Sequence, residues 1–500
     1  MKKKHIKALV RKQLKNEYPN WQRLTKKEKR AILTKVLHEV VSEYDSESKT
    51  EMPLEEMLGI AGQMPTSDIM TLSEMAEFID SHLSSKIIKM TKYSKKVSHI
   101  KNEELSFIDD IIDNTIINRI LAYKGYTPCM RKNSLSMLFR AELLKAIKYP
   151  EISYRKYCTS EYMGMDRKEN KSFIGLPLNR NKMIDHSELS IFRSQMTFSS
   201  QINLIVYILY HFYQSGLLSD CVIHGIDSTE IHNECSYPLA SIEVNGKKIS
   251  IYSDPDCDCG KRRNKRDKSV FVVGYRLHTL TAIDAKTGES FPLVSLLAPA
   301  NHHDSYFLVF LVKLAQSMGV DIKLITADEA YHDKEGELYE QTGTVLTTPP
   351  RTTVNPPEHV DVTTQSVFFD GDCYVPMIHV GSEGLEHEYK CGLDCGEQCH
   401  RSDICPQYRM ISMDQGYFQR IPYNEETVKE ANDIRKNCER PFNLLKNQTG
   451  LEDIRVRSQG SSIARCTIAS IAVLLIQMAG KRVKPKKQEI YQEKLFVVNE

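Results

Sequence analysis

The spacing of hydrophobic residues predicts helices through the first part of the chain. Thr25 and Glu28 have the spacing of a capping box, and the apolar residues that follow recur on one face of a helix. The sequence TLSEMAEFIDSHL at 71–83 predicts another helix, and helical spacing then returns after a polar stretch. We therefore expect a helical, basic N-terminal region at 1–105 and a second helical region at 106–215.

The pattern changes near residue 221 from helical spacing to short apolar runs. CVIHGIDST at 221–229 predicts a strand that ends in an acidic residue, and SIEVNGKKISIYS predicts a hairpin with Asn245 and Gly246 as its tight turn. Two long apolar runs follow, then a helix capped by Asp304, then the strand VDIKLITAD. Strands mixed with a helix predict a mixed α/β sheet, which we place at 216–348.

Regular spacing fails at 349–410, where Pro, Cys, Gly and His are frequent, so this segment is predicted to be an insertion. A helix at 425–448 and a long apolar run after it predict that the α/β domain ends within 411–480, before a basic tail at 481–500. The apolar run is about long enough to span a bilayer, but Arg465 and other polar residues interrupt it, which favours a buried helix. With no signal peptide visible, we expect a cytoplasmic protein without a membrane partner.

Charge is distributed unevenly along the chain. Of 500 residues, 26% are charged and the net charge is only +2, yet Lys and Arg concentrate at the N-terminus, at 260–268 and at 481–487. Separate basic segments in a nearly neutral chain suggest a polyanionic partner, although solvated termini and a loop would account for any one of them. The 13 cysteines, in a reducing compartment, favour metal binding or core packing over a disulfide framework.

Three acidic residues form a candidate site. Asp227 and Asp328 each end an apolar strand, where side chains converge on an open site in α/β sheets. Glu439 lies on the late helix with Arg435 and Lys446, and helical spacing places these three on one face. Carboxylates suit Mg²⁺, and two such ions roughly 4 Å apart stabilise the entering and leaving oxygens at a phosphodiester. The alternative is ordinary structure, since such Asp residues often form turns and such Arg–Glu pairs lie on surfaces.

Six sequence blocks occur in the order found in one enzyme family. They are GIDST at 225–229, SDPD at 253–256, GYRLH at 274–278, APANHHDS at 298–305, TADEAYHD at 326–333, and Arg435 with Glu439 and Lys446. Over 222–348 and 425–460 the chain resembles the DDE domain of cut-and-paste insertion-sequence transposases. It departs from the family pattern at Asn432, where the helix motif normally begins with a tyrosine that would contact DNA.

The resemblance implies an RNase H-like fold, with Asp227 on the first strand, Asp328 on the fourth and Glu439 on a helix after the insertion. It implies Mg²⁺ or Mn²⁺ as cofactor and double-stranded DNA as partner, both the transposon terminal inverted repeats and the target. Water activated by the metal would cut the transposon end, and the freed 3′-OH would attack the target. Arg435 and Lys446 would grip phosphate near the cleaved bond.

Other expectations accompany this resemblance. Arg276 and His278 stand where the family has a basic residue and a histidine, so Arg276 is expected to bind DNA, with sheet packing as the alternative. The region 106–215 is expected to recognise DNA, and synapsis of two ends implies a homodimer. Two other classes remain open: a host-adopted, transposase-derived DNA-binding protein, and a metal-dependent nuclease without strand transfer.

The insertion gathers four cysteines in fifteen residues, namely Cys391, Cys395, Cys399 and Cys405. Zinc prefers four sulfur or nitrogen ligands in a tetrahedron, and a loop too small to bury a core gains its fold from such a metal. We therefore predict a structural zinc site, with free thiols as the alternative.

Overall fold

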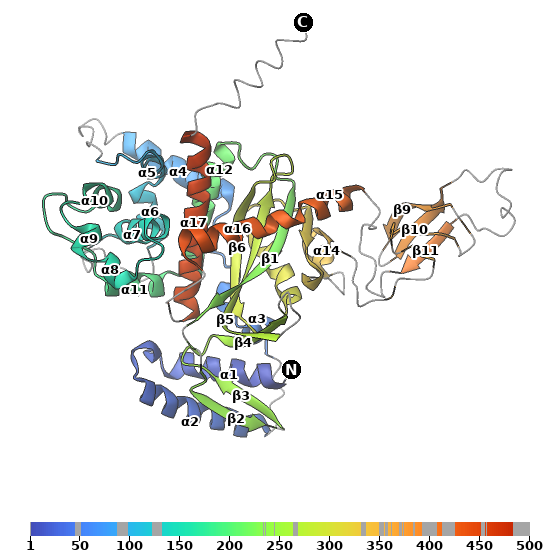
Figure 1. Ribbon diagram of the computed structural model, residues 1–500, viewed down its shortest axis with the longest axis horizontal. Helices are drawn as coiled ribbons and strands as arrows, with labels where there is room; N and C mark the ends of the chain where they lie inside the picture. Colours follow the sequence, from blue (N-terminus) through green and yellow to red (C-terminus); the bar gives the residue numbers. More distant parts are fainter. Residues whose placement is uncertain are drawn as a thin grey trace, which may run out of the picture.

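The computed structural model combines a mixed β-sheet, a helical layer beside it and two smaller parts built around antiparallel strands (Figure 1). The residues that it describes are 2–45, 52–87, 99–122, 133–233, 235, 237–244, 246–263, 269–331, 337–349, 355, 359–361, 363–369, 373, 375–383, 386–392, 408–412, 426–451, 456 and 458–483.

The chain begins with a small module that joins distant parts of the sequence. Helices α1 (Lys2–Glu17) and α2 (Lys26–Asp45) pack against the hairpin of β2 (Ala240–Val244) and β3 (Lys247–Ile251) around a shared apolar core (Figure 1). The capping box is confirmed, because the Glu28 carboxylate accepts from the Thr25 amide at 2.7 Å. The predicted hairpin is also confirmed: Val244 pairs with Lys247, and Gly246 has a φ of 70°, which a glycine adopts without strain. Asn245 lies outside the described residues.

The helical layer follows. Its elements are α3 (Leu54–Leu58), α4 (Leu72–Ile87), α5 (Glu103–Ile111), α6 (Asn114–Ile120), α7 (Leu135–Lys148), α8 (Tyr154–Tyr157), α9 (Ser160–Met163), α10 (Lys168–Ile174), α11 (His186–Gln195) and α12 (Phe198–Gln214). The late apolar run forms α17 (Gln459–Val483), which packs against α5, α7, α11 and α12 on one side and β6 (Ser290–Pro299) on the other. By length and composition α17 could cross a membrane, but 83% of its most apolar window is buried inside the protein, as the sequence predicted.

The main sheet contains parallel and antiparallel strands, as the sequence predicted. Strand β1 (Ile223–His232) runs antiparallel to β5 (Ser269–Ile283) and parallel to β7 (Leu324–Ala327), which in turn is parallel to β8 (Val345–Thr347). Strand β6 pairs antiparallel with β5, which gives the order β6-β5-β1-β7-β8. The first residues of β5 also pair with β4 (Asp258–Arg263), a strand that the sequence pattern did not reveal.

Helices cover both faces of this sheet. On one face Tyr275 and Leu277 of β5 pack against Phe442 and Leu445 of α16 (Arg440–Thr449). On the other face His278 stacks on Phe307, in the turn η5 (Asp304–Phe307) that leads into α13 (Leu308–Ser317). Residues alternate between faces along a strand, so these two coverings show which side of β1 and β5 each side chain occupies.

A smaller sheet lies within the segment predicted to be an insertion. It comprises β9 (Met377–Glu383), β10 (Glu386–Cys391) and β11 (Tyr408–Ser412), all antiparallel (Figure 1). Its inner face shares a core with Val428 of α15 (Glu426–Arg435), the helix that leads back to the main sheet. The helix α14 (Glu337–Thr342) precedes β8.

Candidate functional site

Asp227 lies in the middle of β1 rather than at its end. The strand was expected to stop at the acid, but it continues to His232 because these later residues pair with β5. The Asp227 carboxylate accepts a hydrogen bond from the Ser228 amide at 2.7 Å. Its pKa is raised to about 7, mainly by burial and also by the carboxylates of Asp328, Glu439 and Asp304.

Asp328 follows the last residue of β7. In the parallel register Ile226 pairs with Ala327, so the next residue on each strand, Asp227 and Asp328, become neighbours. Burial and the nearby Asp304 carboxylate raise the pKa of Asp328, whereas the cations of Arg435 and Arg276 lower it. The two predicted aspartates are therefore brought together at one place in the sheet.

Glu439 reaches the site from a helix that is broken. One continuous helix over 425–448 was expected, but α15 ends at Arg435, the 3-10 turn η7 covers Lys436–Glu439, and α16 begins at Arg440. Pro441 is a physical reason for the break, because it has no amide hydrogen for an α-helical bond. The exposed Glu439 carboxylate contributes to the raised pKa of Asp227, so it lies in the same electrostatic environment.

A close approach of two chain segments carries Glu439 to β1. A β-carbon built on Gly225 would lie 1.9 Å from the sulfur of Cys438, so the thiol occupies the space that any larger residue would fill. Cys438 is buried, and burial raises the pKa of its thiol to about 12, which keeps it neutral. Gly225 and Asp227 are two residues apart on one strand, so they share the face that Cys438 covers.

The two cations predicted on the broken helix differ in their surroundings. Arg435 ends α15, and its charge lowers the pKa of Asp328. Its buried Nε has no hydrogen-bond partner among the described residues. Lys446 is half-buried in α16, and the described contacts do not connect it to the three carboxylates. Because the 3-10 turn η7 interrupts the helix, the expectation of one continuous α-helix through Arg435, Glu439 and Lys446 is wrong, and their shared face stays a prediction.

Arg276 is held by an ion pair. Its guanidinium donates to the Asp304 carboxylate at 2.7 Å and lies 4.0 Å from Glu230. Asp304 was expected to cap a helix, but the side chain of His303 takes that role by accepting from Ser305. The carboxylate of Asp304 instead faces the guanidinium, its nearest opposite charge. Asp304 is thus a fourth acid near the site, which the sequence pattern did not identify as such.

His278 supports the site from the opposite face. Its Nδ1 lies 2.9 Å from the Tyr331 hydroxyl, and its ring stacks on Phe307 with centroids 4.0 Å apart. The ring is fully buried, and this lowers the pKa of His278 to about 3, so it is neutral at physiological pH. These contacts fit the alternative given for His278, a residue that packs within the sheet.

The donor chemistry of the site suits a hard cation. Asp227, Asp328 and Glu439 offer carboxylate oxygens, and negative charge at this density favours a divalent ion. Within the described parts of the chain, however, no group of three or more His, Cys, Asp or Glu side chains is arranged to hold a metal ion. The three acids are near one another, but their oxygens do not converge.

The predicted zinc ligands fall largely outside the described residues. Cys391 is the last residue of β10 and half-buried, whereas Cys395, Cys399 and Cys405 are not described. Two histidines lie close to each other on the small sheet, with 3.3 Å between Nε2 of His379 and Nδ1 of His387. The zinc site stays a prediction.

The block SDPD has a structural role that sequence reasoning missed. One carboxylate oxygen of the buried Asp254 accepts from Asn233, from the Tyr275 hydroxyl and from the amide of Ser458. Asp256 pairs with Lys15 at 3.1 Å. These bonds tie the start of α17 and helix α1 to the loop after β3.

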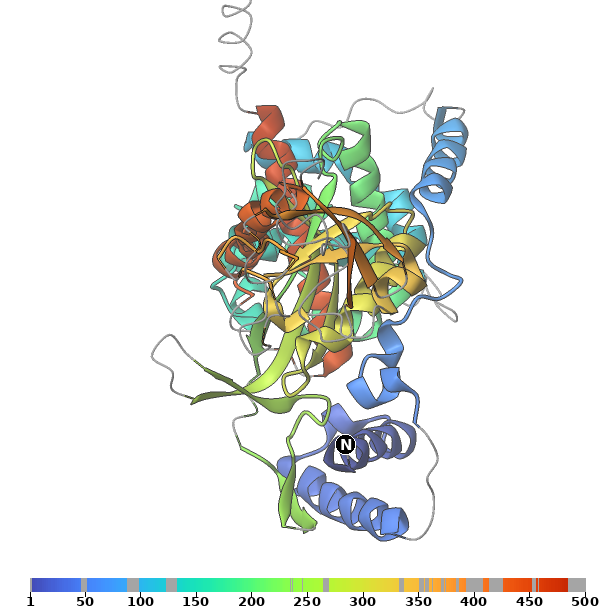
Figure 2. The same ribbon diagram turned by 90° about the vertical axis from the view of Figure 1, so that its right-hand side faces the viewer.

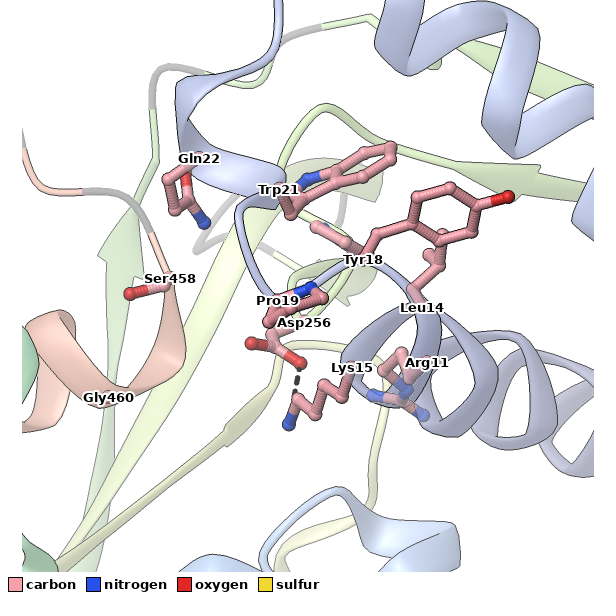
Figure 3. Close-up of a pocket in the computed structure, with 11 residues that line it drawn as sticks. Arg11, Leu14, Lys15, Tyr18, Pro19, Trp21, Gln22, Asp256, Ser458 and Gly460 are labelled. Atoms are coloured by element: carbon pink, nitrogen blue, oxygen red, sulfur yellow. Dashed lines mark ion pairs between the residues drawn. The ribbon is translucent and has the colours of Figure 1, made fainter.

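A pocket of about 360 Å³ lies beside this loop (Figure 3). Arg11, Lys15, Trp21, Asp256 and Ser458 are among its lining residues. Figure 3 draws the ion pair of Lys15 and Asp256 among these lining residues. It is separate from the acidic site, since none of the three acids lines it.

No family model matches the chain, and no curated protein matches it. Among solved structures, the chain is similar to the cryo-EM structure of a piggyBac transposase synaptic complex with hairpin DNA, with 10% identity and a TM-score of 0.33, over 78% of this chain and 77% of that one. A TM-score this low supports no conclusion about function.

Proposed function

We propose that this protein is a DDE-type transposase, which cleaves DNA at transposon ends and joins the freed 3′-OH to target DNA. The strand order β6-β5-β1-β7-β8 supports an RNase H-like fold. In chain order within this set, β1 carries Asp227 and the fourth strand, β7, is followed by Asp328. That agrees with what the sequence resemblance implies.

The observation that carries the proposal is the meeting of three carboxylates from distant parts of the sequence. The parallel register of β1 and β7 makes Asp227 and Asp328 neighbours, and the contact between Gly225 and Cys438 brings Glu439 beside them. Burial is the first cause of the raised pKa of Asp227, and the charges of Asp328 and Glu439 raise it in addition. A structural role alone gives no reason to gather like charges, since repulsion destabilises the fold.

The chemistry follows from this charge. When bound, Mg²⁺ or Mn²⁺ would stabilise negative charge on the entering and leaving oxygens of a phosphodiester. Asp227, Asp328 and Glu439 would hold it. Arg435, with its unpartnered buried Nε near Asp328, would neutralise the adjacent phosphate.

Two further assignments belong to this proposal. Double-stranded DNA is the partner. The protein binds it as a homodimer that brings two transposon ends together, and Lys446 contacts a phosphate. The four cysteines Cys391, Cys395, Cys399 and Cys405 hold a structural zinc ion that organises the insertion.

Cleavage of the DNA that flanks the protein's own coding segment tests the proposal. We expect Mg²⁺-dependent cutting at terminal inverted repeats, with joining of the 3′-OH to a second duplex. The variant Asp227→Asn should neither cut nor join DNA. The variant Asp166→Asn, which changes an exposed acid in the helical layer, should behave as the unmodified protein. If Asp227→Asn cuts normally, the site assignment is wrong.

The same assay separates the alternatives. Cutting without joining would indicate a metal-dependent nuclease. DNA binding without cutting would indicate a transposase-derived DNA-binding protein.

A further inference from the structure

A two-stranded arm extends from the main sheet. It consists of β4 and the first residues of β5, paired from Asp258 opposite Gly274 to Arg263 opposite Ser269, and Figure 2 shows it reaching outward at the lower left. Its base is fixed, because the Asp258 carboxylate accepts from Lys7 at 2.7 Å and from Asn301 at 2.7 Å. The arm is therefore held in one direction relative to the sheet.

An aromatic side chain is exposed on this arm. Phe271 is 66% exposed, although Tyr275 and Leu277, farther along the same face of β5, are buried under α16. The residue paired with Phe271 across the arm is Lys261, which is also exposed. A large apolar side chain exposed beside a cation marks an interaction surface. A partner can bury Phe271 there without disrupting the core of this protein.

Charge identifies the kind of partner. The sequence GKRRNKRDK at 260–268 contains six basic residues and one acidic residue, which is a strong local excess in a chain of net charge +2. Such an excess favours a polyanion over a second copy of a nearly neutral chain.

The arm and the acidic site lie on one strand. Thr279 of β5 pairs with Asp227 and lies eight positions after Phe271 on that strand. At about 3.3 Å per residue, the two points are at most about 26 Å apart. An even number of residues places Phe271 and Thr279 on the same face. A duplex that enters the acidic site can thus reach the arm within about eight base pairs.

We propose that this arm contacts duplex DNA bound at the acidic site, with Lys261 on a phosphate and Phe271 inserted as an apolar wedge against the base steps. Apolar side chains of this kind enter the minor groove and partly unstack the bases in several DNA-binding proteins. The proposal rests on the proposed function, because it assumes that the acidic site acts on DNA.

Binding of a fluorescein-labelled duplex from the flanking DNA tests the arm. We expect Phe271→Ala to weaken binding about tenfold, the effect of losing one contact between a base and an aromatic ring. Val222→Ala is the matched control, because Val222 is an apolar residue of similar exposure, 67%, that precedes β1. Lys261→Ala should reduce the dependence of binding on salt by about one unit of slope, whereas Phe271→Ala should leave this slope unchanged.

Fluorescence gives a second measurement. In Phe271→Trp the new indole should be quenched when DNA binds, and 2-aminopurine placed within about eight base pairs of the cut should brighten with the unmodified protein but not with Phe271→Ala. The only native tryptophan, Trp21, is 6% exposed and contributes a constant background.

The outcomes separate this proposal from the proposed function. Unchanged DNA affinity in Phe271→Ala, or a change in its oligomeric state with DNA affinity unchanged, would overturn the arm proposal even if the protein cuts DNA. If the protein binds duplexes through the arm but never cuts them, the arm proposal holds and the proposed function is wrong. If the protein binds no duplex, both proposals are wrong.

Discussion

The backbone of Gly225 lies directly against the thiol of Cys438. Only a hydrogen fits at this position, because a β-carbon there would come within 1.9 Å of the sulfur. Asp227 stands two residues after Gly225 and Glu439 one residue after Cys438. The contact therefore sets the spacing of two carboxylates that are 212 positions apart in the sequence (439 − 227).

The first prediction changes each of the two residues of this contact to alanine, singly and together. Gly225→Ala should destabilise the fold by about 1–3 kcal/mol, as overpacking does, and should slow DNA cleavage by moving η7 away from β1. Adding Cys438→Ala removes the sulfur and leaves the Cδ1 of Ile283 as the nearest atom at 3.0 Å, the end of a flexible side chain that can shift by a few tenths of an ångström, with the β-carbon of residue 438 at 3.4 Å. The double variant should then recover stability and cleavage, as measured by urea unfolding and the cleavage assay in a double-mutant cycle.

Gly62→Ala is the control for this cycle, because a β-carbon at Gly62 would meet nothing within 4 Å. A double variant as inactive as Gly225→Ala alone would show that the contact does not position Glu439.

The second prediction concerns the ion pair of Arg276 and Asp304, whose side chains are 19% and 12% exposed. Asp304→Asn leaves a poorly solvated guanidinium with only the more distant Glu230, 4.0 Å away, as a counter-charge, so we expect a loss of about 2–3 kcal/mol, somewhat below that of a fully buried pair. The double variant Arg276→Met with Asp304→Leu should restore most of this loss, because it removes both charges. Chemical denaturation measures both. A loss near 0.5 kcal/mol, typical of an exposed pair, would instead leave Arg276 free to contact DNA.

Much of the sheet could be predicted from the sequence, because its strands carry a simple signal. The buried run before Asp328 has the short length of a strand, and the hairpin around Gly246 has the alternating pattern of one. The helix α17 was equally clear, since an apolar run interrupted by Arg465 fits a protein core better than a membrane. These elements depend on local sequence alone.

The relationships that build the site depended on contacts that the sequence does not display. Nothing near Asp304 indicates that it faces Arg276, because the two are brought together by the turn after β6. Strand β4 was hidden because its residues are basic rather than apolar, and its pairing comes entirely from β5. One signal was available and missed: Pro441 marks the break before α16, since proline removes an α-helical hydrogen bond.

The third prediction tests the zinc site. Metal analysis of the purified protein should find about one zinc per chain, and Cys395→Ser or Cys399→Ser should lower this value and expose the insertion to proteolysis. Cys466→Ser is the control, because Cys466 is fully buried in the core under α16. A zinc content well below one per chain in the unmodified protein would remove the site.

The fourth prediction is a pH dependence that arises at Asp254. Burial, together with the neighbouring Asp256 carboxylate, raises the pKa of this carboxyl from 3.8 to about 7. In the unfolded chain the pKa returns to its ordinary value, so between about pH 4 and pH 7 the folded state binds a proton that the unfolded state does not. The contribution to stability is therefore complete below about pH 4 and is lost as the pH rises through about 7.

Asp254→Asn removes the titration while keeping an oxygen at the position. All three strong hydrogen bonds end on one carboxylate oxygen, from Asn233, Tyr275 and Ser458, so an amide oxygen can accept them. As the pH rises from about 5 to about 8, the free energy of unfolding of the unmodified protein should fall. In Asp254→Asn this fall should be smaller by on the order of 2–3 kcal/mol. Asp68→Asn, at an exposed acid, should leave the profile unchanged. Parallel profiles for Asp254→Asn and the unmodified protein would mean that Asp254 stays ionised in the folded state, with its three donors outweighing its burial.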